Sequence, residues 1–146
     1  MLKDSYIYST QLNWKDGSLG VLRSEDFPEL EVASPTDFPF GVPKTWTPEH
    51  LFVASVEICL MTTFTAIARN SKVSLVHYSS ETTGKMEKKE NNKYMFTKIV
   101  IRPVVKVELE KDLERAERIL FKAKNMCLIS NSIKTEVIVE PEILLA

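Results

Sequence analysis

Hydrophobic and polar positions divide the chain into stretches with different periods. Residues 51–68 form the longest apolar run, in which only Glu57 carries a charge and apolar side chains fall on every side of a helical wheel. Thr47 is a typical N-cap residue, and Pro48 after it suits the first helical position. The pattern predicts a central helix over residues 47–70 that needs cover on most of its faces.

A second helix is predicted where the apolar period changes after residue 108. Apolar residues then recur along one face at spacings of 4, 3, 4, 3 and 4. They are Leu109, Leu113, Ala116, Leu120, Ala123 and Cys127. The spacing predicts an amphipathic helix over residues 109–127, with Cys127 at the end of its apolar stripe.

The other apolar residues alternate with polar ones, which is typical of strands. The predicted strands are residues 5–14, 18–25, 29–34, 73–89, 93–108 and 134–144. Pro103 places the fifth of them at a sheet edge or at a bulge, and residues 34–46, with three prolines, predict a loop that packs over other parts of the chain. Strands and helices do not alternate regularly, so this order predicts an α+β fold with an antiparallel sheet against two helices.

Composition narrows the class of protein. The 146 residues are 44% hydrophobic, which suits a single domain, residues 1–146, whose core needs neither metal nor disulfides. The 19 basic and 20 acidic residues are interleaved and leave a formal net charge of −1, so we expect no nucleic-acid partner and no anionic membrane surface. The first residues lack a signal-peptide pattern and the apolar run contains Glu57, so we expect a cytoplasmic protein that does not span a membrane.

Two cysteines and two histidines are the candidates for chemistry. They lack the short spacings of metal ligands, so we expect no metal site and no bound cofactor. On the helical wheel His50 lies about 180° and Glu57 about 160° from Cys59, so neither suits it as a base. Cys59 instead lies in a stripe of small and polar residues. The others in this stripe are Ser55, Thr62 and Thr63.

A lone buried cysteine is usually an inert packing residue. Here both cysteines lie on apolar faces of the two predicted helices, and we expect these faces to pack together on the sheet. A thiolate that reduces an oxidant becomes a sulfenic acid, which a second thiol within reach converts to a disulfide. Cys59 and Cys127 suit that cycle.

We expect a bridging side chain to connect Cys59 with Glu49, a carboxylate near the start of the central helix. It lies about 80° around the helix and nearly three turns below the cysteine, which is too far for direct contact. Arg23, midway along the second predicted strand, is one cation that would bridge the two.

Three segments resemble the OsmC/Ohr family, the osmotically inducible and organic-hydroperoxide-resistance proteins. TPEHLFVASVEIC is similar to the family's proline-glutamate helix start and cysteine-bearing central helix. FTKIVIRPVVKVE and ERILFKAKNMCLISNSI are similar to a later strand and to the helix that precedes the second cysteine. The resemblance extends from Trp14 to Val139.

The resemblance implies an intertwined homodimer in which antiparallel sheets from both chains wrap around two central helices. It also implies a peroxidase in which Cys59 attacks an organic hydroperoxide and Cys127 resolves the product to a disulfide, which an external dithiol or lipoyl-type reductant reopens. Glu49 would pair with an arginine that holds the thiolate. The family's arginine falls near Val21, and Arg23, two residues on and on the same strand face, is the candidate to replace it.

A thiol-dependent peroxidase is therefore the leading hypothesis, with an apolar substrate pocket lined by the loop of residues 34–46. The alternative is a protein of the same fold that binds a small ligand or has a structural role, with both cysteines inert. A thioesterase- or hydrolase-like activity of Cys59 ranks last, because no histidine base accompanies it.

Overall fold

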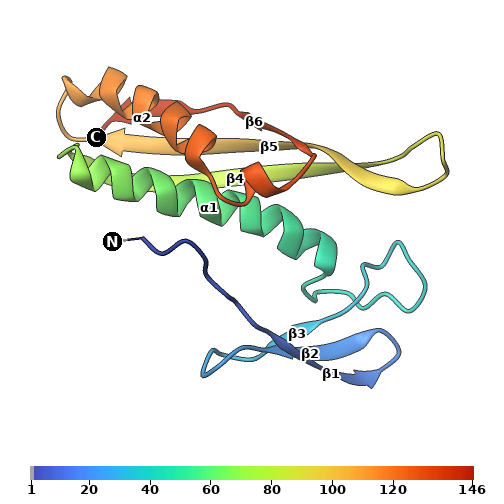
Figure 1. Cartoon of the computed structure of the whole chain (residues 1–146). Helices are drawn as coiled ribbons and strands as arrows, with labels where there is room; N and C mark the ends of the chain where they lie inside the picture. Colours follow the sequence, from blue (N-terminus) through green and yellow to red (C-terminus); the bar gives the residue numbers. More distant parts are fainter. Residues whose placement is uncertain (1) are drawn as a thin grey trace. The chain divides into compact units, whose positions relative to one another are not determined.

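The computed structural model describes residues 2–146, which form two compact units, one ending at Phe52 and the other beginning at Val53. The first unit holds three strands and the start of the long helix α1 (Pro48–Asn70). These strands are β1 (Gln11–Asp16), β2 (Leu19–Arg23) and β3 (Leu30–Val32). The second unit holds the rest of α1 and then β4 (Leu75–Lys88), β5 (Tyr94–Val107), α2 (Asp112–Met126), the short 3₁₀ helix η1 (Ser130–Ser132), β6 (Glu136–Val139) and β7 (Glu142–Leu145) (Figure 1).

The first unit is an antiparallel sheet in the order β1-β2-β3. β1 begins at Gln11, six residues after the predicted start of the strand over residues 5–14, because its last partner in β2 is Arg23. Beyond Arg23 the chain turns, with the Phe27 N–H donating to the Ser24 carbonyl at 2.9 Å. Residues before Gln11 therefore have no strand to pair with, although their composition favours one.

The predicted start of the central helix is confirmed. The hydroxyl of Thr47 accepts a hydrogen bond from the His50 backbone N–H at 3.0 Å, and the Thr47 carbonyl accepts from Leu51 N–H at 2.9 Å. The first contact is the usual N-cap bond, and it satisfies an N–H that has no partner within the helix. The Thr47 hydroxyl also bonds His50 Nδ1 at 2.7 Å, so His50 belongs to the cap.

The second unit is built on a mixed sheet, not the predicted antiparallel one. β4 and β5 form a long antiparallel hairpin, while β6 and β7 both pair with β5 in parallel. The single strand predicted over residues 134–144 is thus two strands, separated at Glu140 and Pro141. β6 pairs with residues 98–101 of β5, and β7 pairs with residues 104–107.

The prediction that Pro103 marks an edge or a bulge is wrong. β5 is a central strand, and Pro103 pairs with Ser80 of β4 without a register shift at that point. On the other side of β5, pairing with β6 ends at Ile101 and pairing with β7 begins at Val104. Pro103 therefore falls where the neighbouring strand changes, and its missing N–H interrupts no continuous ladder.

The core of the second unit lies between the sheet and the two helices. Alternate residues of β5 are fully buried, as a strand covered on that face requires. The buried residues are Ile99, Ile101, Val105 and Val107 from β5, Val56, Leu60, Phe64 and Ala68 from α1, and Ala116, Leu120 and Ala123 from α2. The predicted apolar faces of both helices therefore contribute to one core.

A buried carboxylate sets the start of α2 at Asp112, three residues after the predicted start. Asp112 accepts hydrogen bonds from the Ser74 N–H at 2.9 Å and the Ser74 hydroxyl at 2.7 Å. Arg115 donates to Asp112 and to the Ser71 carbonyl, both at 2.5 Å. This cluster connects the end of α1, the entry to β4 and the first turn of α2.

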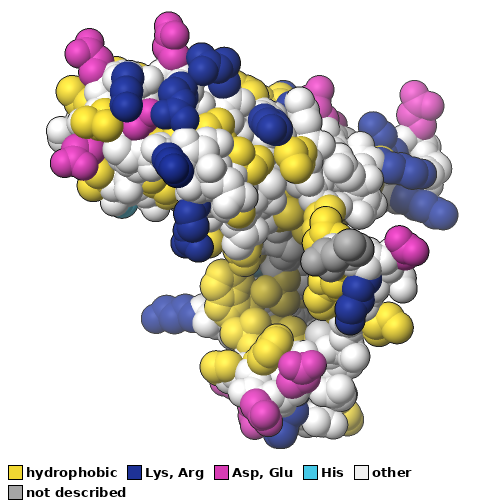
Figure 2. Space-filling view, turned by 60° about the vertical axis from the view of Figure 1, so that its left-hand side comes forward, with side chains coloured by type: hydrophobic (Ala, Val, Ile, Leu, Met, Phe, Trp, Pro, Cys, Tyr) yellow, Lys and Arg dark blue, Asp and Glu magenta, His cyan; other side chains and the backbone are white. Residues whose placement is uncertain are grey.

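The predicted cover of α1 on most faces is not provided within one chain. Ile58 and Met61, which do not belong to the buried stripe, have exposures of 55% and 40%, and apolar side chains also reach the surface elsewhere (yellow in Figure 2). Among the residues described, α1 is also long and apolar enough by composition to cross a membrane, a test that core helices of soluble proteins pass as well.

Candidate functional site

The structure brings the two cysteines together. Cys59 lies in the middle of α1 and is partly exposed, whereas Cys127 directly follows α2 and is buried. Both are free thiols, and the two side chains are joined by a hydrogen bond. The expectation that the cysteine-bearing faces of the two helices meet is therefore correct.

Hydrogen bonds around Cys59 favour its thiolate. Burial raises the pKa of Cys59, but hydrogen bonds from the Cys127 thiol, the Ile129 and Leu128 backbone N–H groups and the Thr63 hydroxyl outweigh it, so the pKa is lowered. A lowered pKa increases the fraction of the nucleophilic form at neutral pH. Of the small and polar stripe predicted beside Cys59, Thr63 thus contacts the thiol, while the Thr62 hydroxyl donates to the Cys59 carbonyl at 3.2 Å.

The backbone donors come from the turn after α2. At Cys127 the chain leaves the helix in an extended conformation, with φ −67° and ψ 117°, and the Asn131 N–H then donates to the Cys127 carbonyl at 3.0 Å. This tight reversal turns the N–H groups of Leu128 and Ile129 towards Cys59. Sequence reasoning missed these groups, and the only signal for them was a polar turn directly after a cysteine.

Cys127 has the opposite electrostatic environment. Burial is the largest cause that raises the pKa of Cys127, and its hydrogen bond to Cys59 and the Cys59 charge raise it further. Hydrogen bonds from the side chain and backbone of Ser130 act in the other direction without reversing the shift. The pair therefore consists of a partly exposed thiol that ionises readily and a buried one that keeps its proton.

The two charged residues predicted to support Cys59 lie in the first unit. The Glu49 Oε1 atom is buried and has no hydrogen-bond partner within residues 2–146. Arg23 Nη2 pairs with Glu29 Oε1 at 3.1 Å, and the two side chains are 50% and 54% exposed. The predicted bridge from Arg23 to Glu49 and Cys59 stays a prediction.

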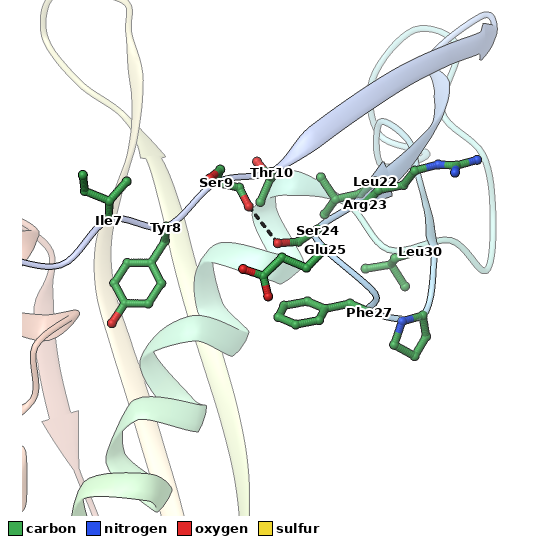
Figure 3. Close-up of a pocket in the computed structure, with 11 residues that line it drawn as sticks. Ile7, Tyr8, Ser9, Thr10, Leu22, Arg23, Ser24, Glu25, Phe27 and Leu30 are labelled. Carbon is green, nitrogen blue, oxygen red and sulfur yellow. Dashed lines mark hydrogen bonds between the residues drawn. The ribbon is translucent and has the colours of Figure 1, made fainter.

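A cavity of about 540 Å³ lies in the first unit beside the end of β2. Figure 3 shows the rings of Tyr8 and Phe27 turned towards a common space, while the Arg23 side chain extends away from it. The cavity is lined by residues from the range 7–30, not by the loop of residues 34–46 that we expected to form the pocket. The end of that loop lines a second cavity of about 410 Å³, with Lys44, Thr45, Trp46 and His50.

A metal centre has no support in the described part of the chain. No group of three or more histidine, cysteine, aspartate or glutamate side chains within residues 2–146 is arranged to hold a metal ion.

Most of the chain is similar to one protein family. Residues 41–142 match the sequence profile of the family described as "OsmC-like protein". No curated protein matches the chain by sequence.

Solved structures with the same fold are similar over almost their whole length. An OsmC-like protein of unknown function from Vibrio cholerae is 24% identical, covers 94% of this chain and 99% of its own, and has a TM-score of 0.84. An organic hydroperoxide resistance protein from Elizabethkingia anophelis is 18% identical, with coverage of 99% and 100% and a TM-score of 0.76. One from Legionella pneumophila is 21% identical, with coverage of 99% of both chains and a TM-score of 0.73.

Proposed function

The chain belongs to the family of OsmC-like proteins, and on this premise we propose that it is a thiol-dependent peroxidase that reduces organic hydroperoxides. The observation that carries the proposal is the asymmetry of the cysteine pair, with the pKa of Cys59 lowered and that of its hydrogen-bonded neighbour Cys127 raised. The names of two structural neighbours, both organic hydroperoxide resistance proteins, support a peroxidase-like role.

In the first step the Cys59 thiolate attacks the terminal oxygen of the hydroperoxide. A sulfur–oxygen bond forms and the oxygen–oxygen bond breaks, and the alkoxide takes a proton and leaves as the alcohol. Cys59 is then a sulfenic acid. Hydrogen bonds from the Leu128 and Ile129 N–H groups and from Thr63 hold the attacking thiolate in place.

In the second step Cys127 attacks the oxidised sulfur of Cys59. A sulfur–sulfur bond forms, the sulfur–oxygen bond breaks and water is released, so the sulfenic acid is consumed before it is oxidised further. An external dithiol, of the lipoyl type or similar, then reduces the disulfide by two exchange steps and restores both thiols. The protein itself needs no bound cofactor for this cycle.

Glu49 and Arg23 are assigned supporting roles in the proposal. The buried Glu49 oxygen without a partner in the described chain is an acceptor that suits a guanidinium, since a buried carboxylate oxygen left unpaired is costly. Arg23 would supply that guanidinium by exchanging Glu29 for Glu49. Such an arginine would also stabilise the Cys59 thiolate.

The proposal includes a homodimer in a reducing cytoplasm. Support for a dimer comes from apolar residues of α1 outside its buried stripe, Ile58 and Met61, which are exposed in the single chain. An apolar helix face of this kind needs cover, and a second copy of the same helix provides a surface of the same chemistry. A cytoplasmic location would keep both cysteines reduced between turnovers.

A second candidate is a family member that binds a small ligand or serves a structural role, with both cysteines reduced. The specific observation in its favour is the Arg23–Glu29 ion pair, since it occupies the guanidinium that the peroxidase would use. The two candidates differ in what a hydroperoxide does to the thiols.

The test starts from fully reduced protein and adds an organic hydroperoxide such as cumene hydroperoxide. A peroxidase should lose both thiols for about one equivalent of oxidant, and mass spectrometry of the digested protein should find the Cys59 and Cys127 peptides linked. Retention of both thiols with excess hydroperoxide would favour the second candidate. Hydrogen peroxide, run in parallel, shows whether the substrate must carry an organic group.

A further inference from the structure

The two backbone donors to Cys59 belong to consecutive peptide groups in the turn after α2. The N–H of Leu128 shares its peptide group with the Cys127 carbonyl, and the N–H of Ile129 shares its peptide group with the Leu128 carbonyl. No peptide bond within residues 2–146 is cis. In a planar trans peptide the C=O and N–H bonds point in opposite directions, so a contact that holds the carbonyl also sets the direction of the N–H.

Each of these two carbonyls accepts a hydrogen bond from a residue four positions further on. The Asn131 N–H donates to the Cys127 carbonyl at 3.0 Å, and the Ser132 hydroxyl donates to the Leu128 carbonyl at 2.8 Å. The first donor is a backbone group, which every residue type except proline provides. The second is a side chain, so the direction of the Ile129 N–H depends on which residue type stands at position 132.

Ser132 is the last residue of η1, and its backbone has a separate anchor. The Ser132 N–H donates to the Ile129 carbonyl at 3.0 Å. The residue is exposed, so its hydroxyl fills no space in the core. A change that removes only this hydroxyl should therefore leave η1 and the core in place, while the Leu128 carbonyl loses its donor.

We propose that Ser132 is a positioning residue for the peroxidase cycle, whose hydroxyl holds the peptide group between Leu128 and Ile129 with its N–H directed at the Cys59 sulfur. Ser132 acts through that peptide group. This inference rests on the proposed function, because it concerns the thiolate that performs the first step. Of the two backbone N–H groups, the one that Ser132 positions lowers the pKa of Cys59 more.

The physical effect of the hydroxyl is on the ionisation of Cys59. Without it, the Leu128 carbonyl takes its hydrogen bond from water, which fixes no direction. The Ile129 N–H is then directed at Cys59 for less of the time. A hydrogen bond to an ionised acceptor is stronger than one to a neutral acceptor, so the thiolate loses more from this change than the thiol does.

The experiment measures the ionisation of Cys59 with iodoacetamide, so it needs no peroxide. The thiolate displaces iodide and forms a stable sulfur–carbon bond, so the rate follows the fraction of thiolate. Reduced full-length protein is sampled over time at each pH, and mass spectrometry of the digest gives the rate for Cys59 apart from that for Cys127. Cys127 is the titratable group hydrogen-bonded to Cys59, and its raised pKa keeps it protonated while Cys59 ionises.

Ser132→Val and Ser132→Thr form a matched pair, because the two side chains have the same branching and only threonine keeps the hydroxyl. Ser132→Val should slow alkylation of Cys59 at neutral pH by roughly two- to tenfold, the range expected for the loss of one hydrogen bond. The difference should vanish in alkali, where Cys59 is fully ionised, so the midpoint of the pH profile moves upward. Ser132→Thr should keep the wild-type profile.

Asn131→Ala is the control within the same turn. The Asn131 side-chain amide donates to the Asn125 carbonyl at 3.4 Å, whose peptide group carries the N–H of Met126 and neither donor to Cys59. The substitution leaves the Asn131 N–H on the Cys127 carbonyl, so the pH profile should stay that of wild type. Ser132→Ala, which adds no branch, should shift the profile as Ser132→Val does and replaces it if valine disturbs η1.

The proposal is overturned if the variants without the hydroxyl keep the wild-type midpoint, or if Ser132→Thr or Asn131→Ala shifts it equally. It is also overturned if loss of the hydroxyl slows alkylation by one factor at every pH, because that result indicates restricted access and not ionisation. The proposed function fails in a different way, since a protein whose Cys59 shows the expected pH profiles but does not react with hydroperoxides is not a peroxidase.

Discussion

α1 and α2 each bury one stripe of residues in the core, but their other faces differ. The faces of α2 away from the sheet carry charged residues, among them Glu117 and Arg118. Such faces need no cover by another part of the protein. α1 has Glu57 as its only charge between Leu51 and Ala68, so its outer faces are apolar or small. The two helices are thus built for different surroundings although they contribute to the same core.

The same contrast applies to the cysteine that each helix contributes. Cys59 is held within the regular backbone of α1 and receives hydrogen bonds that lower its pKa. Cys127 lies where α2 has ended and the chain reverses, and its pKa is raised by burial. A fixed, readily ionised thiol suits the first attack, whereas a thiol at a helix end suits a residue that has to move towards a partner sulfur.

The largest effects should come from replacing one cysteine at a time. Cys59→Ser should abolish hydroperoxide consumption from the first turnover, because serine without an adjacent base is a poor nucleophile. Cys127→Ser should still consume about one equivalent and leave Cys59 as sulfenic acid, which drifts to sulfinic acid with excess oxidant. Single-turnover kinetics with mass analysis distinguishes the two variants. If both consume the same amount of hydroperoxide in the first turnover, Cys59 and Cys127 do not have the different roles proposed for them.

The next largest effect should come from a charge on the outer face of α1. Ile58→Arg should dissociate the proposed homodimer, because an arginine buried without a partner at an interface costs about 2 kcal/mol or more. Glu117→Arg on the outer face of α2 is the matched control and should leave the sedimentation coefficient unchanged. A wild-type protein that sediments as a monomer at micromolar concentration would contradict the dimer itself.

A smaller effect is expected where α1 approaches β4. A Cβ on Gly84 would lie 2.5 Å from Val53 Cγ2 and 3.2 Å from Phe96 Cε1, so Gly84→Ala should lower the free energy of unfolding by about 1–3 kcal/mol. Val53→Ala in the same chain should recover part of that loss, because it removes the contacted methyl groups. Denaturant unfolding of both variants measures this, and an additive double mutant would show that the close approach is not the cause.

The smallest effect concerns the start of α2 and depends on pH. Hydrogen bonds from the Ser74 hydroxyl and N–H, and then from Arg115, lower the pKa of Asp112 against the opposing effect of burial. Since the folded-state pKa is below the ordinary value of 3.8, Asp112 stabilises the fold above that pH and the contribution is lost as pH falls through the lowered pKa.

Asp112→Asn should therefore unfold at a lower temperature than wild type at neutral pH, and the difference should shrink in acid. Thermal unfolding followed by circular dichroism across the acid range measures it. Glu114→Gln, in the same helical turn but outside the cluster, is the control. A difference that is constant with pH would show that the charge of Asp112 is not what stabilises this turn.

The sequence alone predicted the elements whose signals are local. Thr47 and Pro48 marked the start of α1, the 4-3 spacing marked the stripe of α2, and alternation marked β4 and β5. Cys59 and Cys127 followed from their places on apolar helix faces, and their proximity was expected because both faces had to pack on one sheet. Periodicity and capping depend on neighbouring residues, so they can be read without knowing the fold.

Only the tertiary structure decided what depends on residues far apart in the chain. The parallel pairing of β6 and β7 with β5, which makes Pro103 acceptable in a central strand, is a choice of partner that alternation does not encode. The hydrogen bonds from the Leu128 and Ile129 N–H groups to Cys59, and that from the Ser80 hydroxyl to Glu57, likewise exist only once a turn and a strand are packed against α1. Hydrogen bonds and burial of this kind set thiol reactivity, and they are properties of the packed structure, not of any segment.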